Sequence, residues 1–555
     1  MEDNVFLQKE LNLIELCDTN SQLANKIVAS AHSYPCIQKT ELDGIPTCII
    51  VKKPLSSVYL NRVVKITGSI IKSYPVYFKN VTTEQLCLKC NEISYLTEQE
   101  MRKRKDSNIC NSCGSSNVKL VQNFQSSFPS QSIRIQDMSN SAAMSETIEV
   151  LIEGPNAGLY HPGDKISATG IVVRKWKQLR PNEPMLSTIC LKHLQIVKEN
   201  DEDEEFFEIK HRVEEYSLKD TFSKRKFILD SFASEIFGIY NVKLGLILAL
   251  IGGTPDGENT RTNSHVLLVG DPGTGKSHLL KMVSKLINPS VLTNGVGTSD
   301  AGLTSCAIKQ GKEWTLEAGA LVLADTGICC IDEFNRLKVN EKSGLLESME
   351  QQTISIAKAG IVTSLNTRCS VFAAAGTRYS YDTKRPVSDN LGMSTPLISR
   401  FDLIFGLFDR GKRAFDSEIA DKILERDFVQ KLPESAKWSL PTLKMYLSQC
   451  RKRKNKIPES LSDILIKYYT RKKKIEGNNE FNTIRMLESL VRLAESHSKL
   501  MNNDAVMEED VFIAIILMES TLNSANNVDL SSDLVFFSKD CFNKVKLSIK
   551  QKYSL

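Results

Sequence analysis

The sequence predicts a multidomain fold in which a small β-rich barrel or sandwich is followed by an α/β domain and then by a helical region. Short β-branched segments broken by Gly, Pro and Asn run through residues 63–197, as in small all-β domains. After residue 222, buried apolar runs alternate with amphipathic stretches, which is typical of a parallel sheet covered by helices. Residues 440–523 have a helical pattern throughout. A chain of 555 residues is also too long for one hydrophobic core, so several domains are expected.

The composition indicates an ordinary globular protein. Hydrophobic residues make up 41% and charged residues 25%, with 71 basic and 66 acidic side chains, which excludes a disordered or collagen-like chain. The longest apolar stretch, residues 244–251, is too short to cross a bilayer, and the acidic start does not resemble a secretory signal. We therefore expect a cytosolic or nuclear protein without a membrane partner. In such a reducing compartment, clustering among the 14 cysteines favours metal binding over disulfides.

Four cysteines in the β-rich region form two C-x-x-C pairs. They are Cys87, Cys90, Cys110 and Cys113, with 19 residues between the pairs. Two such pairs can close a tetrahedral thiolate site, and this spacing is typical of zinc ribbons. The alternative, a redox-active thiol pair, lacks a βαβ setting and leaves the second pair unexplained. We predict a structural Zn²⁺, which would stabilise folding rather than catalyse because sulfur fills every ligand position.

A basic segment near the end of the β-rich region is a candidate DNA contact. Its charged residues surround Trp176 and are Arg174, Lys175, Lys177 and Arg180. Positive charge mixed with an aromatic ring is typical of grooves that bind single-stranded nucleic acid. Basic turns are also common without such a role. The basic clusters at 102–105, 451–454 and 471–474 are more often solvated surface, and they support only a nuclear, DNA-associated protein.

A glycine-rich segment marks a nucleotide site. It follows a strand-like run at 265–269, precedes a helical run at 278–286, and fits the pattern G-x-x-x-x-G-K-S. In such a loop the backbone N–H groups hold the phosphates, Lys276 reaches the β and γ oxygens, and Ser277 binds Mg²⁺. With both flanks correct, a chance glycine-rich turn is the weaker interpretation. We predict binding of ATP and Mg²⁺ by Gly270, Asp271, Pro272, Gly273, Thr274, Gly275, Lys276 and Ser277.

An apolar run at 327–331 ends in two adjacent carboxylates, Asp332 and Glu333. The carboxyl end of an interior strand is where an open α/β sheet places its chemistry. We expect Asp332 to orient Mg²⁺ and its waters, and Glu333 to polarise the attacking water. Taken alone, this motif would be better interpreted as a strand followed by an acidic helix cap. In combination with the phosphate loop, the catalytic interpretation is the better one. Cys329 and Cys330 are interpreted as packing residues.

Residues 327–335 resemble the signature of the minichromosome maintenance (MCM) helicases, a branch of the AAA+ ATPases. Residues 350–360 and 399–402 are similar to further blocks of that family in the same order, and the resemblance runs from about residue 63 to 523. Gly275 and the string at 329–335 are similar to the repair-associated eighth and ninth members, nearest the ninth. The resemblance implies an OB-type barrel with a zinc ribbon, then an α/β AAA+ P-loop ATPase domain with a helical lid.

The resemblance also implies a ring, usually a hexamer, with ATP between neighbouring subunits. Arg400 then corresponds to the arginine finger and Arg485 to the sensor arginine of the lid, and both join Lys276, Asp332 and Glu333 as catalytic candidates. Without the resemblance, both arginines would be surface residues. Lys358 corresponds to the tip of a pore hairpin that grips DNA, although a lone lysine at a turn usually carries no meaning. Residues 294–314 correspond to a second pore insertion.

One residue departs from the family pattern. The family ends the strand at 371–375 with an asparagine that helps to position the attacking water, whereas this chain has Gly376, which has no side-chain donor. We predict an ATP-dependent DNA helicase or translocase subunit in the nucleus. It would act on single-stranded DNA in homologous recombination and repair, with copies of itself or with a partner resembling the eighth member. The alternative is a hydrolysis-impaired, ATP-binding structural subunit.

The predicted domain limits follow from these patterns. They are a short, poorly matched N-terminal segment over 1–60, an OB-type DNA-binding domain over 61–198 with its zinc ribbon at 87–113, an acidic linker over 199–221, an AAA+ core over 222–430, a helical lid over 431–525 and a C-terminal tail over 526–555.

Overall fold

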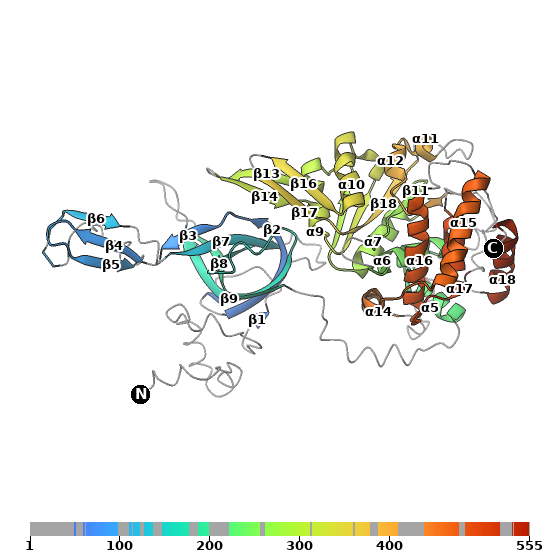
Figure 1. Ribbon diagram of the computed structural model, residues 1–555, viewed down its shortest axis with the longest axis horizontal. Helices are drawn as coiled ribbons and strands as arrows, with labels where there is room; N and C mark the ends of the chain where they lie inside the picture. The colour runs from blue at the N-terminus through green and yellow to red at the C-terminus, as the bar shows by residue number, and fades with distance from the viewer. Residues whose placement is uncertain are drawn as a thin grey trace, which may run out of the picture. The chain divides into compact units, whose positions relative to one another are not determined.

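The computed structural model divides into two compact units, Met1–Asp201 with Ala307–Glu317 and Glu202–Cys306 with Ala318–Leu555 (Figure 1). The predicted N-terminal segment and acidic linker lie almost entirely outside the residues that the structure describes. The described residues are 49–50, 59–60, 63–80, 82–97, 110, 112–113, 115–121, 127–136, 147–176, 187–198, 221–255, 261–310, 313–358, 361–377, 387–408, 438–476, 483–521, 536 and 538–553.

Five strands of the first unit close into a barrel. β2 pairs with β9, β9 with β10, β10 with β8 and β8 with β7, and β7 returns to β2. Alternate residues point inward and bury side chains such as Ile66, Ile133 and Val150, so the predicted β-rich barrel is confirmed. Gly170 allows close approach of two strands, since a Cβ there would lie 2.3 Å from the carbonyl oxygen of Lys192. The strands are β2 (Val63–Ser73), β7 (Ser127–Gln136), β8 (Thr147–Glu153), β9 (Lys165–Trp176) and β10 (Ser187–Lys198).

Three smaller elements extend the barrel sheet. β1 (Ile49–Ile50) runs parallel to β2, and β3 (Tyr77–Asn80) lies at the edge beside β7. A hairpin of β13 (Ser305–Gln310) and β14 (Glu313–Ala318) joins through β14, which pairs with β2. The ribbon is a separate antiparallel sheet in the order β5-β4-β6, inserted between β3 and β7. Its strands are β4 (Thr82–Cys87), β5 (Ile93–Thr97) and β6 (Val118–Val121).

The second unit is built on a five-stranded parallel sheet in the order β12-β15-β18-β11-β19. Its interior strands are almost fully buried, which is why they consist of apolar runs, as predicted. Helices α6 and α7 pack against the sheet, and Gly245 permits the close packing of α6, since a Cβ there would lie 2.4 Å from the Phe405 ring. The strands are β11 (Val266–Gly270), β12 (Ser290–Asn294), β15 (Ile328–Asp332), β18 (Ser370–Gly376) and β19 (Leu403–Leu407).

The connections between these strands carry helices and one further hairpin. The hairpin pairs β16 (Thr353–Lys358) with β17 (Ile361–Asn366). The helices are α5 (Thr221–Ser231), α6 (Tyr240–Ile251), α7 (Lys276–Leu286), α8 (Asp300–Leu303), α9 (Ala320–Leu323), η5 (Phe334–Arg336), α10 (Val339–Gln351), α11 (Val387–Leu391) and α12 (Thr395–Ile398).

The lid is helical, as predicted, and a further helix packs onto it. The lid helices are α14 (Leu440–Lys452), α15 (Glu459–Glu476), α16 (Ile484–Met501) and α17 (Glu508–Glu519). The predicted tail contains α18 (Lys539–Tyr553), which buries Phe542, Ile549 and Tyr553 in the same core. The ring of Tyr553 stacks edge-on against Tyr468 of α15, with centroids 4.8 Å apart. Residues predicted as a tail are therefore part of the lid core.

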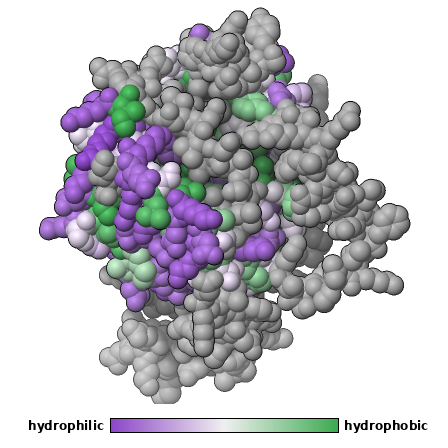
Figure 2. Space-filling model, turned by 90° about the vertical axis from the view of Figure 1, so that its right-hand side faces the viewer, coloured by the Kyte–Doolittle hydropathy of each residue, from purple (hydrophilic) through white to green (hydrophobic). Residues whose placement is uncertain are grey.

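Hydrophilic side chains predominate on the described surface of the face that carries α15 and α18 (Figure 2). Among the helices that the structure describes, none combines the length and the apolar character needed to cross a bilayer.

Candidate active site and metal centre

The phosphate loop joins β11 to α7 at the carboxyl edge of the parallel sheet. Gly273 and Gly275 have positive φ angles of 82° and 87°, a left-handed conformation that favours glycine. A Cβ on Gly270 would lie 1.9 Å from the carbonyl oxygen of Leu407 in β19, so only glycine fits there. The hydroxyl of Thr274 donates to the Asp271 carbonyl at 2.9 Å. The sequence between a buried strand and a helix therefore folds into the tight turn that was predicted.

Lys276 is the first residue of α7, and its ammonium group lies against the loop. Nζ donates to the Gly270 carbonyl at 3.0 Å, to the Asp271 carbonyl and to the Thr274 hydroxyl at 3.2 Å. Partial burial lowers the pKa of Lys276, while the carboxylates of Asp271 and Asp332 oppose this shift. Ser277 follows on the same helix and is exposed. The loop thus presents a cation and backbone N–H groups, which suits a bound polyphosphate.

The predicted carboxylates lie at the end of β15. The backbone N–H of Glu333 donates to Asp332 Oδ1 at 2.9 Å, and Glu333 has a left-handed φ of 49°. Gly295 packs against this turn, since a Cβ there would lie 2.5 Å from the Glu333 carbonyl oxygen. Only β18 separates β15 from β11 in the sheet. Asp332, Glu333 and the phosphate loop therefore share one carboxyl edge.

Gly376 ends β18 between these two groups. It is the register partner of Gly270, the first residue of the loop. A Cβ on Gly376 would have no atom of the residues that the structure describes within 4 Å. The side-chain amide of Asn335 donates to the Gly376 carbonyl at 3.4 Å. The strand end beside the loop has room for a side chain but carries none.

The two predicted catalytic arginines come together on a residue that the sequence did not single out. Arg400 follows α12 and donates to the Pro396 carbonyl at 2.7 Å, and its other terminal nitrogen pairs with Glu350. Arg485, in the first turn of α16, donates to the other Glu350 oxygen at 2.5 Å. In the described part of the chain, no hydrogen bond or ion pair joins either guanidinium to the phosphate loop or to Asp332. The only signal for Glu350 was its place at the start of the block at 350–360.

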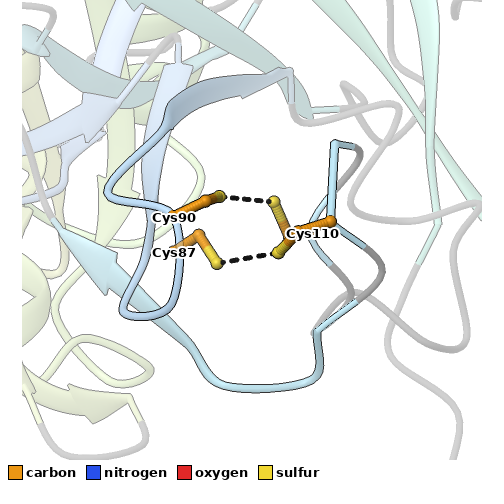
Figure 3. Close-up of side chains that lie close together, drawn as sticks. Cys87, Cys90 and Cys110 are labelled. Atoms are coloured by element: carbon orange, nitrogen blue, oxygen red, sulfur yellow. Dashed lines mark hydrogen bonds between the residues drawn. The ribbon is translucent and has the colours of Figure 1, made fainter.

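The four cysteines of the ribbon converge, and Figure 3 labels three of them, Cys87, Cys90 and Cys110. The sulfurs of Cys87 and Cys113 are 3.5 Å apart, those of Cys90 and Cys110 are 3.6 Å apart, and all four lie within 4.8 Å of one another. Zinc–sulfur bonds of about 2.3 Å in a tetrahedron place sulfurs about 3.8 Å apart, so this set fits Zn²⁺. Backbone N–H groups of Cys90 and Lys89 lower the pKa of Cys87 to about 6, which favours its thiolate. At Cys90 the backbone of Glu92 also lowers the pKa, but the neighbouring Cys87 sulfur and burial outweigh it and raise the value to about 12.

The candidate DNA contacts lie on two separate hairpins. Arg174 and Lys175 are exposed at the end of β9, where Lys175 pairs with Glu149 at 2.7 Å. Lys177 and Arg180 lie outside the described residues, and so does the basic cluster at 102–105. Lys358 ends β16 opposite Ile361 of β17, which places it next to the turn of that hairpin. Residues 294–314 contain α8, β13 and the start of β14.

Three family models match the chain. They are the MCM OB domain over residues 51–175, the MCM P-loop domain over 212–427 and the MCM AAA-lid domain over 441–522. These matches and the structure confirm the predicted fold class, an OB-type barrel followed by a P-loop ATPase domain with a helical lid.

Known proteins from plants and animals are also similar to the chain. A probable DNA helicase MCM9 of Oryza sativa subsp. japonica is 36% identical over 442 residues, which are 76% of this chain and 65% of that protein. The protein of the same name from Arabidopsis thaliana is 36% identical over 437 residues, 75% of this chain and 68% of that protein. The DNA replication licensing factor mcm7 of Xenopus tropicalis is 36% identical over 417 residues, 71% of this chain and 57% of that protein. The chain thus spans about two thirds of the length of the plant relatives.

Proposed function

Because the chain belongs to the minichromosome maintenance family and is similar to its ninth member, we propose that it is a subunit of an ATP-dependent DNA helicase or translocase. One observation carries this proposal: the phosphate loop and the carboxylates Asp332 and Glu333 share the carboxyl edge of one parallel sheet. That arrangement suits the hydrolysis of a nucleoside triphosphate, which needs a phosphate cradle beside acids that act on metal and water.

Each residue of the site has a proposed role. The loop from Gly270 to Ser277 cradles the phosphates, and Lys276 balances their negative charge. Ser277 and Asp332 would hold Mg²⁺, which supplies further positive charge at the phosphates. Glu333 orients the attacking water. Arg400 and Arg485 would face a second ATP, bound to the neighbouring subunit of a hetero- or homo-hexameric ring. In support, both arginines bind Glu350, and among the described residues neither contacts the phosphate loop of its own chain.

Metal and DNA binding complete the proposal. The ribbon cysteines would hold one structural Zn²⁺, supported by the spacing of their sulfurs. Single-stranded DNA would contact Arg174, Lys175 and Lys177 of the barrel and Lys358 of the β16–β17 hairpin. The proposed setting is the nucleus, in homologous recombination and repair, with a partner subunit resembling the eighth member. That setting rests on the similarity to the ninth member. We also propose the domain limits that the sequence predicts.

A second candidate function is an ATP-binding structural subunit that hydrolyses slowly. Gly376 favours it, because the strand end beside the phosphate loop carries no side-chain donor.

ATP turnover of the full chain, with single-stranded DNA and with or without a partner subunit, separates the candidates. Lys276→Ala and Glu333→Gln should each abolish turnover, whereas Lys281→Ala, which changes an exposed lysine of the same helix, should leave it unchanged. Low turnover that is equal in the wild type and Glu333→Gln would favour the structural subunit. A wild-type chain that binds no MgATP under any assembly condition would overturn both candidates.

A further inference from the structure

We infer that Glu350 is a positioning residue that holds Arg400 and Arg485 side by side for the nucleotide of the neighbouring subunit. The inference rests on the proposed function. It identifies the carboxylate that orients the two arginines which would contact the ATP of the neighbouring subunit. Glu350 lies at the end of α10, Arg400 follows α12, and Arg485 belongs to α16 of the lid. One carboxylate therefore joins three elements of the second unit.

The contacts divide the carboxylate evenly between the arginines. Oε2 accepts from Arg400 and Oε1 accepts from Arg485. Charge-assisted bonds of this kind are about twice as strong as neutral ones. The hydrogen bond from Arg400 leads the causes that lower the pKa of Glu350, so the carboxylate stays ionised near neutral pH. Each oxygen thus fixes the tip of one guanidinium.

Two features indicate that the arginines depend on this carboxylate. Guanidinium groups that approach the same point repel one another unless a negative charge lies between them. Arg485 is also the second residue of α16, and the positive end of a helix disfavours a cation there. The tip of Arg400 has its other bond to the Pro396 carbonyl, while its buried Nε has no hydrogen-bond partner among the described residues. Removal of the Glu350 charge would therefore separate the two tips.

A buried network fixes the base of the Arg400 segment independently of Glu350. Asp402 accepts hydrogen bonds from Arg492 at 2.7 Å and from the hydroxyl of Ser489, and both donors belong to α16. The backbone after Arg400 is thereby held on the lid helix that carries Arg485. Asp402 is buried, whereas 45% of the Glu350 side chain is exposed. Loss of Glu350 should thus change where the guanidiniums point rather than whether the unit folds.

The test compares Glu350→Gln with Glu347→Gln in the full chain. Glu347 lies one turn earlier on α10 and accepts from the Ser355 N–H, and within the described ranges no arginine pairs with it, so it is a matched carboxylate. Glu350→Gln should lower kcat for ATP between tenfold and a hundredfold, with KM changed less than threefold, because the arginines act mainly in the transition state. Glu350→Asp, which keeps the charge on a shorter side chain, should restore part of the loss. Glu347→Gln should keep wild-type kcat and the same unfolding midpoint as Glu350→Gln.

Mixing the inactive Glu333→Gln with the impaired Glu350→Gln locates the defect. Glu333→Gln damages the half-site that holds the nucleotide, and Glu350→Gln would damage the half-site that faces the neighbour. In rings assembled from equal amounts of the two variants, about a quarter of the interfaces combine an intact nucleotide-holding half with an intact arginine half. Turnover should therefore return to about a quarter of the wild-type value. An unchanged kcat in Glu350→Gln, or no recovery on mixing, overturns the inference while the wild type still hydrolyses ATP. A wild type that binds no MgATP overturns the proposed function and this inference with it.

Discussion

The two units of the molecule place their charges differently. In the second unit, charged side chains are buried in pairs: Asp402 with Arg492, and Lys472 with Glu519 at 2.6 Å. In the first unit, Lys72 of β2 is also buried beside Glu317, but Lys175 of β9, which pairs with Glu149, is 48% exposed. A buried pair fixes geometry because removal of one partner leaves an uncompensated charge. An exposed pair leaves its lysine available to another anion.

The ribbon differs from both in how few of the side chains that the structure describes there are buried. Among its described residues only Cys87 and Cys110 are buried, whereas Leu88 and Ile93 are 56% and 53% exposed. Three short strands cannot bury enough surface to fold alone. The comparison teaches that the second unit is stabilised by its own packing, while the ribbon is expected to depend on the proposed Zn²⁺.

Removal of zinc should have the largest effect. Structural zinc contributes on the order of 10 kcal/mol to the folding of small domains, so chelation or Cys110→Ser should unfold the ribbon and leave the second unit folded. Limited proteolysis should then cut within residues 82–121, while ATP turnover is retained. Cys541→Ser, at a half-buried cysteine of α18, is the control. A purified chain without zinc that resists proteolysis there would contradict the difference between the two regions.

Asp402→Asn should have the next largest effect. The side chain holds Arg261 at 3.0 Å and Arg492 at 2.7 Å. Among the described residues, loss of its charge would leave the buried Arg492 with only the exposed Glu488, at 3.8 Å, as an acidic partner. We expect a loss of about 3–5 kcal/mol in the free energy of unfolding, measured by urea denaturation. Glu149→Gln, which breaks the exposed pair on the barrel, should cost less than about 1 kcal/mol. Equal losses would show that burial does not distinguish the two kinds of pair.

The pH dependence of the wild type tests the same charge. Burial alone would raise the pKa of Asp402, but Arg492 and Arg261 hold it well below its usual value. A lowered native pKa gives a stabilisation that is complete above the unfolded value of about 3.9 and is lost as the pH falls toward the native value. Unfolding free energy should therefore decline below about pH 4 more steeply in the wild type than in Asp402→Asn. Parallel curves would contradict this account.

Local patterns in the sequence were sufficient to predict the phosphate loop, the carboxylates after β15 and the convergence of the cysteines, because neighbouring residues determine each of them. Glu350 could not be assigned in this way, since it is 50 residues from Arg400 and 135 from Arg485, and only tertiary packing joins them. The helix α18 had an available signal. Its buried residues Phe542, Ile549 and Tyr553 recur at helical spacing, although the segment was predicted as a tail.

Gly376→Asn tests an exception to the close packing of the second unit. At Gly376, beside the phosphate loop, there is space where a side chain could begin. No atom of the described residues lies within 4 Å of a Cβ there, so a side chain can start from this position without a clash at Cβ. An added donor at the strand end should raise ATP turnover about tenfold, equivalent to about 1.4 kcal/mol in the activation free energy. Gly376→Ala fills the same space without a donor and should leave turnover unchanged. Equal turnover in all three proteins would mean that this strand end does not limit the reaction.

Lys175→Ala should have the smallest effect on stability and a distinct effect on binding. Its pair with Glu149 is exposed, so the free energy of unfolding should change by less than about 1 kcal/mol. If Lys175 contacts a phosphate of single-stranded DNA, the slope of log affinity against log salt should fall by about 0.7. The matched control is Lys192→Ala. Lys192 lies on β10 and forms a less exposed pair with Glu153 of β8, so this change should leave the slope unchanged. A lower stability with an unchanged slope would show that Lys175 has a structural role, like the buried pairs of the second unit. DNA binding would then not be needed to explain the charge of Lys175.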